Sequence, residues 1–234
     1  MADEFKLNNK EQRADEYNER GISYFNINKY DKAVEEFTKA IEIISDDPDL
    51  YHNRGMAYYS MKKYEEAIKD LKKSIALDGS VPDYHNVLGS VYEDMGLVDK
   101  AIQEFTEAIK LEDDIPDYYY NRGNAYWKRG EVDKALDDYS KAADLDSTDQ
   151  IFVYKKYEAL MDLGRLEDAL ATVDKAIRIV PANYNYLLMK ADVLIRMGRR
   201  EEASAVLEEV EKLDPGNPEA ERLRKMAMQG DTVR

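Results

Sequence analysis

The chain has 234 residues, of which 34 are basic and 49 are acidic, so its formal net charge at pH 7 is -15. This charge opposes binding to nucleic-acid phosphates and to anionic membranes, and it favours a neutral or basic partner. The absence of cysteine excludes disulfides and thiolate metal sites. The sequence contains no run of about 18 consecutive apolar residues, so it does not indicate a membrane span. We therefore expect a cytoplasmic protein that binds no nucleic acid and does not insert into membranes.

The first ten residues differ from the rest of the chain. Residues 1–10 are polar apart from Phe5 and Leu7, and we interpret them as an N-terminal arm. From about Glu11 the apolar residues follow a helical spacing, without the two-residue alternation of a half-buried strand. The sequence thus predicts an all-α domain over residues 11–229, followed by a disordered tail over 230–234.

Small residues recur in this domain every 34 positions. The period is set by six alanines: Ala33, Ala67, Ala101, Ala135, Ala169 and Ala203. A fixed period of this length is typical of stacked helical hairpins. We place the units at 14–47, 48–81, 82–115, 116–149, 150–183 and 184–217. The segment 218–229 begins a seventh unit, and its polar residues indicate a capping helix.

Two rows of glycine have different roles in each hairpin. The first row lies within apolar helical segments, where glycine lets two helices approach closely. Its members are Gly21, Gly55, Gly89 and Gly123. The second row lies between helices, where a residue at positive φ ends the first of them. Its members are Gly96, Gly130, Gly164 and Gly198, with Asn28 and Lys62 in the first two units.

The fifth unit departs from the first row, because Tyr157 takes the place of the small residue. A phenol at this position predicts either a locally wider hairpin or a tyrosine that leans out past the small side chain of Val173.

These residues resemble the tetratricopeptide repeat, a 34-residue helix-turn-helix unit with small, aromatic and alanine positions in a fixed order. The second unit carries the pattern as Tyr51, Gly55, Tyr58, Ala67 and Leu71. The resemblance covers nearly the whole chain. It implies a right-handed α-solenoid, or superhelix, of six such units with a capping helix. It also implies a non-catalytic scaffold that binds a peptide or a segment of a partner protein.

In this family the first helix of each unit lines a concave groove, and the resemblance carries this assignment onto the chain. Asparagine both donates to and accepts from a peptide backbone, and aromatic rings offer rigid contact area. The candidate peptide-binding residues are His52, Asn53, Met56, Tyr59, Asn86, Tyr120, Asn121, Asn124, Trp127, Tyr154 and Lys155. Met161, Leu188, Met189 and Arg196 fall on groove positions as well. The asparagines have a second interpretation, as helix-start and solvation residues, and both remain open at this point.

Two alternatives to peptide capture follow from the same resemblance. One subclass of the family acts as co-chaperone adaptors and clamps a terminal carboxylate with lysine, arginine and asparagine. Only Asn53 matches that clamp, and two of the cations that it needs are absent. The other alternative is a self-assembling structural or oligomerisation scaffold, because hairpin arrays can stack or pair. The oligomeric state is left open.

No catalytic or metal-binding motif stands out in the sequence. His52 and His85 are the only histidines, and no third ligand lies at a suitable helical spacing. No phosphate-binding glycine loop and no serine elbow is present. We therefore expect neither enzymatic activity nor a cofactor.

Overall fold

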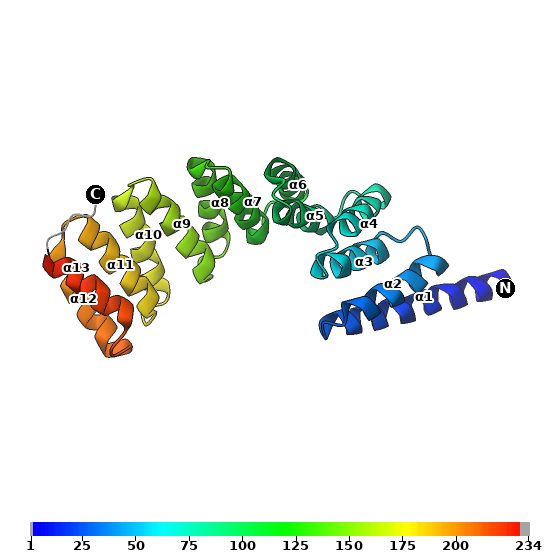
Figure 1. The fold of residues 1–234 in the computed structure, drawn as a ribbon, viewed down its shortest axis with the longest axis horizontal. Coiled ribbons are helices and arrows are strands. Elements are labelled where there is room, and N and C mark those ends of the chain that lie inside the picture. The colour runs from blue at the N-terminus through cyan, green and yellow to red at the C-terminus, as the bar shows by residue number, and fades with distance from the viewer. Residues whose placement is uncertain (1, 230–234) are drawn as a thin grey trace. The chain divides into compact units, whose positions relative to one another are not determined.

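The computed structural model describes residues 2–229, with side chains from residue 9 to residue 228. This part of the chain forms thirteen helices and no strand (Figure 1). The helices are α1 (Ala2–Asn26), α2 (Tyr30–Ile43), α3 (Pro48–Ser60), α4 (Tyr64–Leu77), α5 (Pro82–Asp94), α6 (Val98–Leu111), α7 (Pro116–Lys128), α8 (Val132–Leu145), α9 (Gln150–Asp162), α10 (Leu166–Ile179), α11 (Tyr184–Arg196), α12 (Arg200–Leu213) and α13 (Pro218–Gln229). The tail expected over 230–234 lies outside the described residues.

The helices belong to two compact parts of the chain, which are larger than the 34-residue repeats. We call the part that ends at Ala125 unit 1 and the part that begins at Tyr126, within α7, unit 2. In unit 1, α1 pairs with α2, α3 with α4 and α5 with α6, and the second helix of each of the first two pairs contacts the next pair. In unit 2, α9 pairs with α10 and α11 with α12, and α13 packs on both helices of the last pair. We call the first helix of each pair its A helix and the second its B helix.

The helix boundaries follow the residues that mark them in the sequence. Asp47 caps α3 by accepting a hydrogen bond from the Asp49 backbone N–H at 2.9 Å, and Pro48 occupies the first helical turn. The turn glycines adopt positive φ, as Gly96 does with φ 74°. Asn28 and Lys62 hold the same conformation with φ 58° and 59°, which confirms that they replace glycine in the first two hairpins.

The other glycine row lies where A and B helices approach closely. A Cβ atom built on Gly89 would lie 2.7 Å from the ring of Phe105, and one on Gly55 would lie 3.0 Å from Leu71 Cγ. Phe105 and Leu71 are fully buried B-helix residues. The expected packing role of this row is therefore confirmed at these positions.

Helix α1 differs from the expected boundary, because it begins at Ala2 and includes residues 2–10 instead of following a separate arm. This segment contains no proline or glycine, and alanine, glutamate, lysine and leucine are good helix formers. Nothing in the local sequence therefore ends the helix before Asn26.

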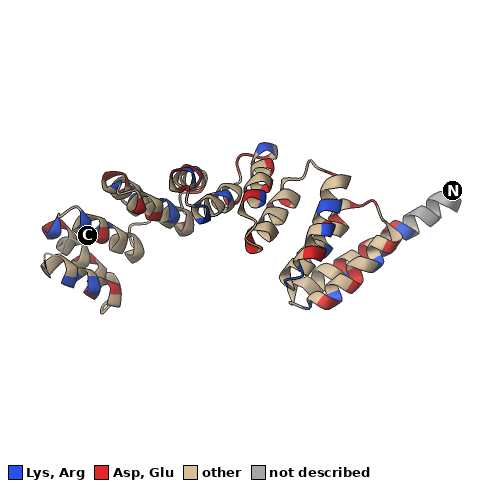
Figure 2. Ribbon diagram, turned by 45° about the horizontal axis from the view of Figure 1, so that its top comes forward, with Lys and Arg blue, Asp and Glu red and all other residues tan. Residues whose placement is uncertain are grey.

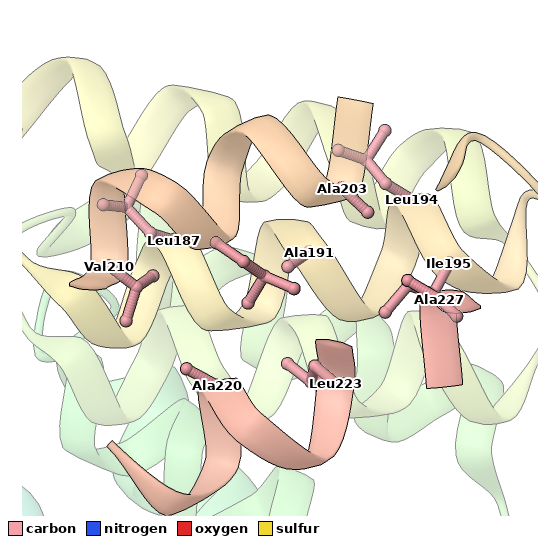
Figure 3. Packing of buried hydrophobic residues seen from close by; sticks show 10 residues of the cluster. Leu187, Ala191, Leu194, Ile195, Ala203, Val210, Ala220, Leu223 and Ala227 are labelled. Atoms are coloured by element: carbon pink, nitrogen blue, oxygen red, sulfur yellow. The ribbon is translucent and has the colours of Figure 1, made fainter. Parts of the chain in front are cut away.

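Helix α13 buries one face and leaves the other polar. Ala220, Leu223 and Ala227 point towards α11 and α12 in Figure 3, where they join Leu194 and Ala203 in a buried apolar cluster. Glu221 and Arg222 lie on the exposed face. A polar outer face is what the end of a repeat array requires, so α13 caps the last hairpin.

Candidate functional site: the faces of the A helices

In unit 1, the candidate asparagines bind one another between consecutive A helices. Asn53 Nδ2 donates to Asn18 Oδ1 at 3.1 Å, and Asn121 Nδ2 donates to Asn86 Oδ1 at 2.9 Å. The partners of each pair are 35 residues apart, one period plus one residue. These amides therefore join neighbouring repeats, a role that the sequence analysis did not anticipate.

Tyrosine and aspartate form a second set of links with the same offset of 35 residues. Tyr84 donates to Asp49, Tyr118 donates to Asp83 at 2.6 Å, and the candidate Tyr59 donates to Asp94 at 2.9 Å. Burial and the accepting carboxylate raise the pKa of Tyr59, so its hydroxyl remains a donor at neutral pH. The Tyr59 hydroxyl is thus engaged within the fold.

The two histidines lie in different surroundings. The His52 ring packs on the Tyr84 ring with centroids 4.9 Å apart, and burial lowers the pKa of His52. His85 Nδ1 lies 2.8 Å from Glu104 Oε2 on the B helix of its own pair. Among the described residues no group of three or more His, Asp or Glu side chains is placed to hold a metal ion.

The other candidate residues of α3 and α7 are partly enclosed. Met56 and Asn53 line a hollow of about 240 Å³ in unit 1, together with Ile22 and Phe25. Tyr120 and Asn124 are half-buried on α7. Trp127, which belongs to unit 2, is also half-buried and has its ring centroid 6.4 Å from that of Tyr139. Tyr139 is fully buried on α8, so part of the tryptophan packs within its own hairpin.

The A helices of unit 2 carry a larger hollow of about 610 Å³. Apolar and aromatic side chains of α9 and α11 form most of its wall, with carboxylates at intervals. The lining residues are Gln150, Ile151, Tyr154, Tyr157, Glu158, Met161, Asp162, Asn185, Tyr186, Leu188, Met189, Asp192, Arg196 and Glu219. We call this site the α9–α11 hollow. It brings together Tyr154 and the groove positions Met161, Leu188, Met189 and Arg196 of the sequence analysis.

Two large side chains of α9 are exposed at this hollow. Ile151 is 54% exposed and Tyr154 is 47% exposed, although both belong to residue types that normally contribute to a core. The candidate Lys155 lies beside them and forms an ion pair with Glu158 at 2.8 Å. An exposed apolar surface lined by a few polar groups is a common feature of binding sites.

Tyr157 shows how the fifth hairpin accommodates its departure from the repeat. Its side chain is buried, and its hydroxyl donates to Asp192 Oδ2 on α11 at 2.8 Å. Helix α9 also packs less closely against α10 than α3 does against α4. The tyrosine therefore reaches across to the next A helix. The packing between α9 and α10 is looser, as the sequence analysis expected for this hairpin.

Tyr186 lines the same hollow and differs from its counterparts in unit 1. It occupies the repeat position of Tyr84 and Tyr118, but Ile151 stands where they have an aspartate acceptor. Its hydroxyl is buried and has no hydrogen-bond partner among the described residues. The spacing of 35 residues is visible in the sequence, so this unpaired donor was detectable there.

Sequence models of known protein families match most of the repeats. Models described as tetratricopeptide repeat match residues 48–80, 116–149 and 160–227, and one described as TPR repeat matches 21–62 and 97–130. The chain belongs to the tetratricopeptide-repeat (TPR) family. Proteins of this family are generally non-catalytic and mediate contacts between proteins. A comparison with curated proteins finds no match.

Solved TPR structures share the fold. The TPR protein YrrB has 23% identity and a TM-score of 0.66, over 82% of this chain and 99% of that protein. PilF of Pseudomonas aeruginosa has 17% identity and a TM-score of 0.70, over 93% and 99%. MamA has 24% identity and a TM-score of 0.62, over 68% and 92%. Within residues 2–229, no helix has the length and apolar character needed to cross a membrane.

Proposed function

We propose that this protein is a non-catalytic scaffold that binds a segment of a partner protein in the α9–α11 hollow. The observation that carries the proposal is the exposed pair Ile151 and Tyr154 at the edge of a hollow of about 610 Å³. Leu188 and Met189 form its apolar wall from α11. A partner side chain seated there would bury apolar surface that the isolated chain leaves in water.

The charges around the hollow favour a neutral or basic partner segment. Its lining contains four carboxylates, of which Glu158 pairs with Lys155, Asp192 with Arg196 and Glu219 with Arg222. The carboxylate of Asp162 has no such cation among the described residues and leaves the hollow with a net negative charge. A basic residue flanking an apolar anchor would therefore find a complementary field. This preference agrees with the formal charge of -15 on the whole chain.

Tyr186 is a further residue that lines the hollow. Its hydroxyl is buried in the free protein and has no partner in the described part of the chain, so we propose that a bound segment must displace neighbouring side chains before a peptide carbonyl accepts from it. The TPR protein YrrB, which shares the fold, is described as having an unusual peptide-binding site. A cytoplasmic location and the lack of nucleic-acid binding belong to the same proposal.

A peptide selection tests this function. Peptides enriched from a displayed random library on the wild-type protein are measured by fluorescence polarisation against two variants. Leu188→Glu places a charge in the hollow and should weaken binding at least about tenfold, as expected at an interface hot spot. Ile22→Glu, a matched change at an exposed apolar position of unit 1, should leave affinity within about twofold.

The outcomes separate the proposal from its alternative. Circular dichroism and thermal unfolding first establish that both variants fold. Peptides that bind Leu188→Glu as well as wild type would overturn the proposed site. A dimer or filament in sedimentation without peptide, dissociated by Leu188→Glu, would instead assign the hollow to self-assembly.

A further inference from the structure

One position of the A helices carries a basic residue in five of the six repeats. The members of this row, spaced by multiples of 34 residues, are Arg20, Arg54, Arg122, Lys156 and Lys190. In three of them the structure shows an ion pair with a B helix. Arg20 lies 2.9 Å from Glu36, Arg54 lies 2.6 Å from Asp70, and Lys190 lies 2.8 Å from Asp174.

Lys156 lacks such an acid. The repeat position of Asp70 is occupied by Thr172 in this hairpin, and the position of Asp174 is occupied by Ser140 on the preceding B helix. Both replacements are hydroxyls, which cannot neutralise an ammonium group. Lys156 is half-buried, and no ion-pair partner is found for it among the described side chains. Partly burying an uncompensated cation costs free energy that a bound anion would recover.

Lys156 lines a second hollow of unit 2, of about 400 Å³, where Ser140 and Thr172 are also found. Helices α8 and α10 form its sides, and it adjoins the face of α9 that carries Val153, Lys156 and Leu160. The residues that α9 contributes to the α9–α11 hollow are different ones. The loose packing of α9 on α10 is found in the same hairpin.

The charges in this second hollow select for a single negative charge. Its other cations are already paired, Arg165 with Asp168 at 2.6 Å and Lys175 with Asp144 at 3.1 Å. Asp137 adds an exposed carboxylate at the edge. Once the two ion pairs cancel, Lys156 and Asp137 are the charges that remain in this lining. A single carboxylate matches the charge of Lys156, whereas a doubly charged phosphate would leave one negative charge unmatched beside Asp137. Leu136, Val153, Leu160 and Ile179 offer apolar contact to the rest of a ligand.

We propose that the hollow between α8 and α10 binds a ligand with a single carboxylate on an apolar stem. The ligand carboxylate takes the place of the acid that the other repeats provide, accepting hydrogen bonds from Lys156, Ser140 and Thr172. Its source is either a small carboxylic acid or an acidic residue of a peptide. The site is independent of the partner-binding hollow, because the two have no lining residue in common.

The test is an NMR titration of the whole protein with hexanoate, with 1-hexanol as the uncharged control. We expect hexanoate to shift the amide signals of Ser140, Lys156 and Thr172, and hexanol to bind about tenfold more weakly or not at all. The peptide Ac-Gly-Leu-Glu-NH₂ forms a parallel titration. Tighter binding of this peptide than of hexanoate identifies a peptide source, and the reverse order identifies a small molecule.

Three variants make the result specific. Lys156→Met should weaken hexanoate binding about tenfold, whereas Lys190→Met, at the same repeat position but paired with Asp174, should change it by less than about twofold. Thr172→Asp restores the missing acid, so it should block hexanoate and raise the melting temperature. If Thr172→Asp fails to fold, Ser140→Asp supplies the acid from the preceding B helix and should have the same effect. Unchanged binding in Lys156→Met, or equal binding of hexanol, would overturn the proposal.

Discussion

Lys62 and Asn28 occupy the helix-ending position at which the next four hairpins have glycine. Both adopt positive φ, 59° and 58° respectively. Asn28 receives a hydrogen bond from the Tyr30 hydroxyl at 2.6 Å, and asparagine tolerates this conformation better than other side chains do. Lysine has no such local compensation. Among these hairpin turns, the turn after α3 therefore carries the residue least suited to positive φ, Lys62.

Lys62→Gly should stabilise the protein by about 1 kcal/mol, because glycine adopts positive φ without a Cβ clash. For a chain of this size the melting temperature should rise by roughly 2–4 °C in a thermal unfolding experiment. Lys63→Gly is the matched control. The backbone of Lys63 has φ -88°, so glycine only adds unfolded-state freedom there and the melting temperature should fall. An equal response of the two variants would contradict the strain at Lys62.

At the scale of helices, side chains 35 residues apart join one A helix to the next. Tyrosine–aspartate pairs and asparagine pairs provide these links in unit 1, as Tyr118 with Asp83 and Asn121 with Asn86 illustrate. The donor lies on the later helix in the pair Tyr118–Asp83 and on the earlier helix in the pair Tyr59–Asp94. In unit 2, Tyr157 of α9 likewise donates forward to Asp192 of α11. Hydrogen bonds require a defined geometry, so these links fix the position of one A helix relative to the next more closely than apolar contacts alone would.

The pair Ile151 and Tyr186 is the place in unit 2 where this link lacks its acceptor. Ile151→Asp should provide it, and one hydrogen bond to the buried Tyr186 hydroxyl is worth about 1 kcal/mol. A carboxylate in the first turn of α9 is also favoured by the helix dipole. Because Ile151 is 54% exposed, little apolar burial is lost. We expect an increase in the denaturant midpoint for unfolding.

A double-mutant cycle checks the cause of that increase. In the Tyr186→Phe background the donor is absent, so Ile151→Asp should lose the part of its gain that comes from the hydrogen bond. The same stabilisation in both backgrounds would mean that the aspartate acts through the helix terminus alone.

For the whole molecule, the excess of 15 negative charges is the dominant electrostatic property. Figure 2 shows acidic and basic residues interleaved along the helices instead of gathered in blocks of one sign. Exposed neighbours such as Lys110 and Glu107, 2.7 Å apart, form local pairs that contribute little to stability. The unpaired excess repels itself in the folded state.

Raising NaCl from about 20 to 300 mM at pH 7 should therefore raise the melting temperature, since salt screens this repulsion over distances beyond about 10 Å. Differential scanning calorimetry measures the effect. Near the sequence pI of about 4.7 the net charge vanishes, and the salt effect should shrink. A melting temperature that falls with salt at pH 7 would show that favourable ion pairs outweigh the repulsion.

The sequence alone indicated the repeat unit, the family and the residues that begin and end the helices of the hairpins, but not the start of α1. The same local features recur every 34 residues: positive-φ residues such as Gly96 end helices, prolines such as Pro48 begin them, and Gly89 marks a close approach between helices. These features are short-range steric constraints, so they can be recognised in the sequence alone.

Only the tertiary structure decided which polar side chains remain available for a partner. Asn53 and Asn121 look alike in the sequence as peptide ligands, yet each donates to an asparagine of the neighbouring repeat. For Lys156 the missing acid can be seen in the sequence, but only the structure places Lys156, Ser140 and Thr172 in the lining of one hollow. Whether a polar side chain can bind a partner depends on which side chains of other repeats lie within hydrogen-bond distance of it. A pattern of residue types does not specify those distances.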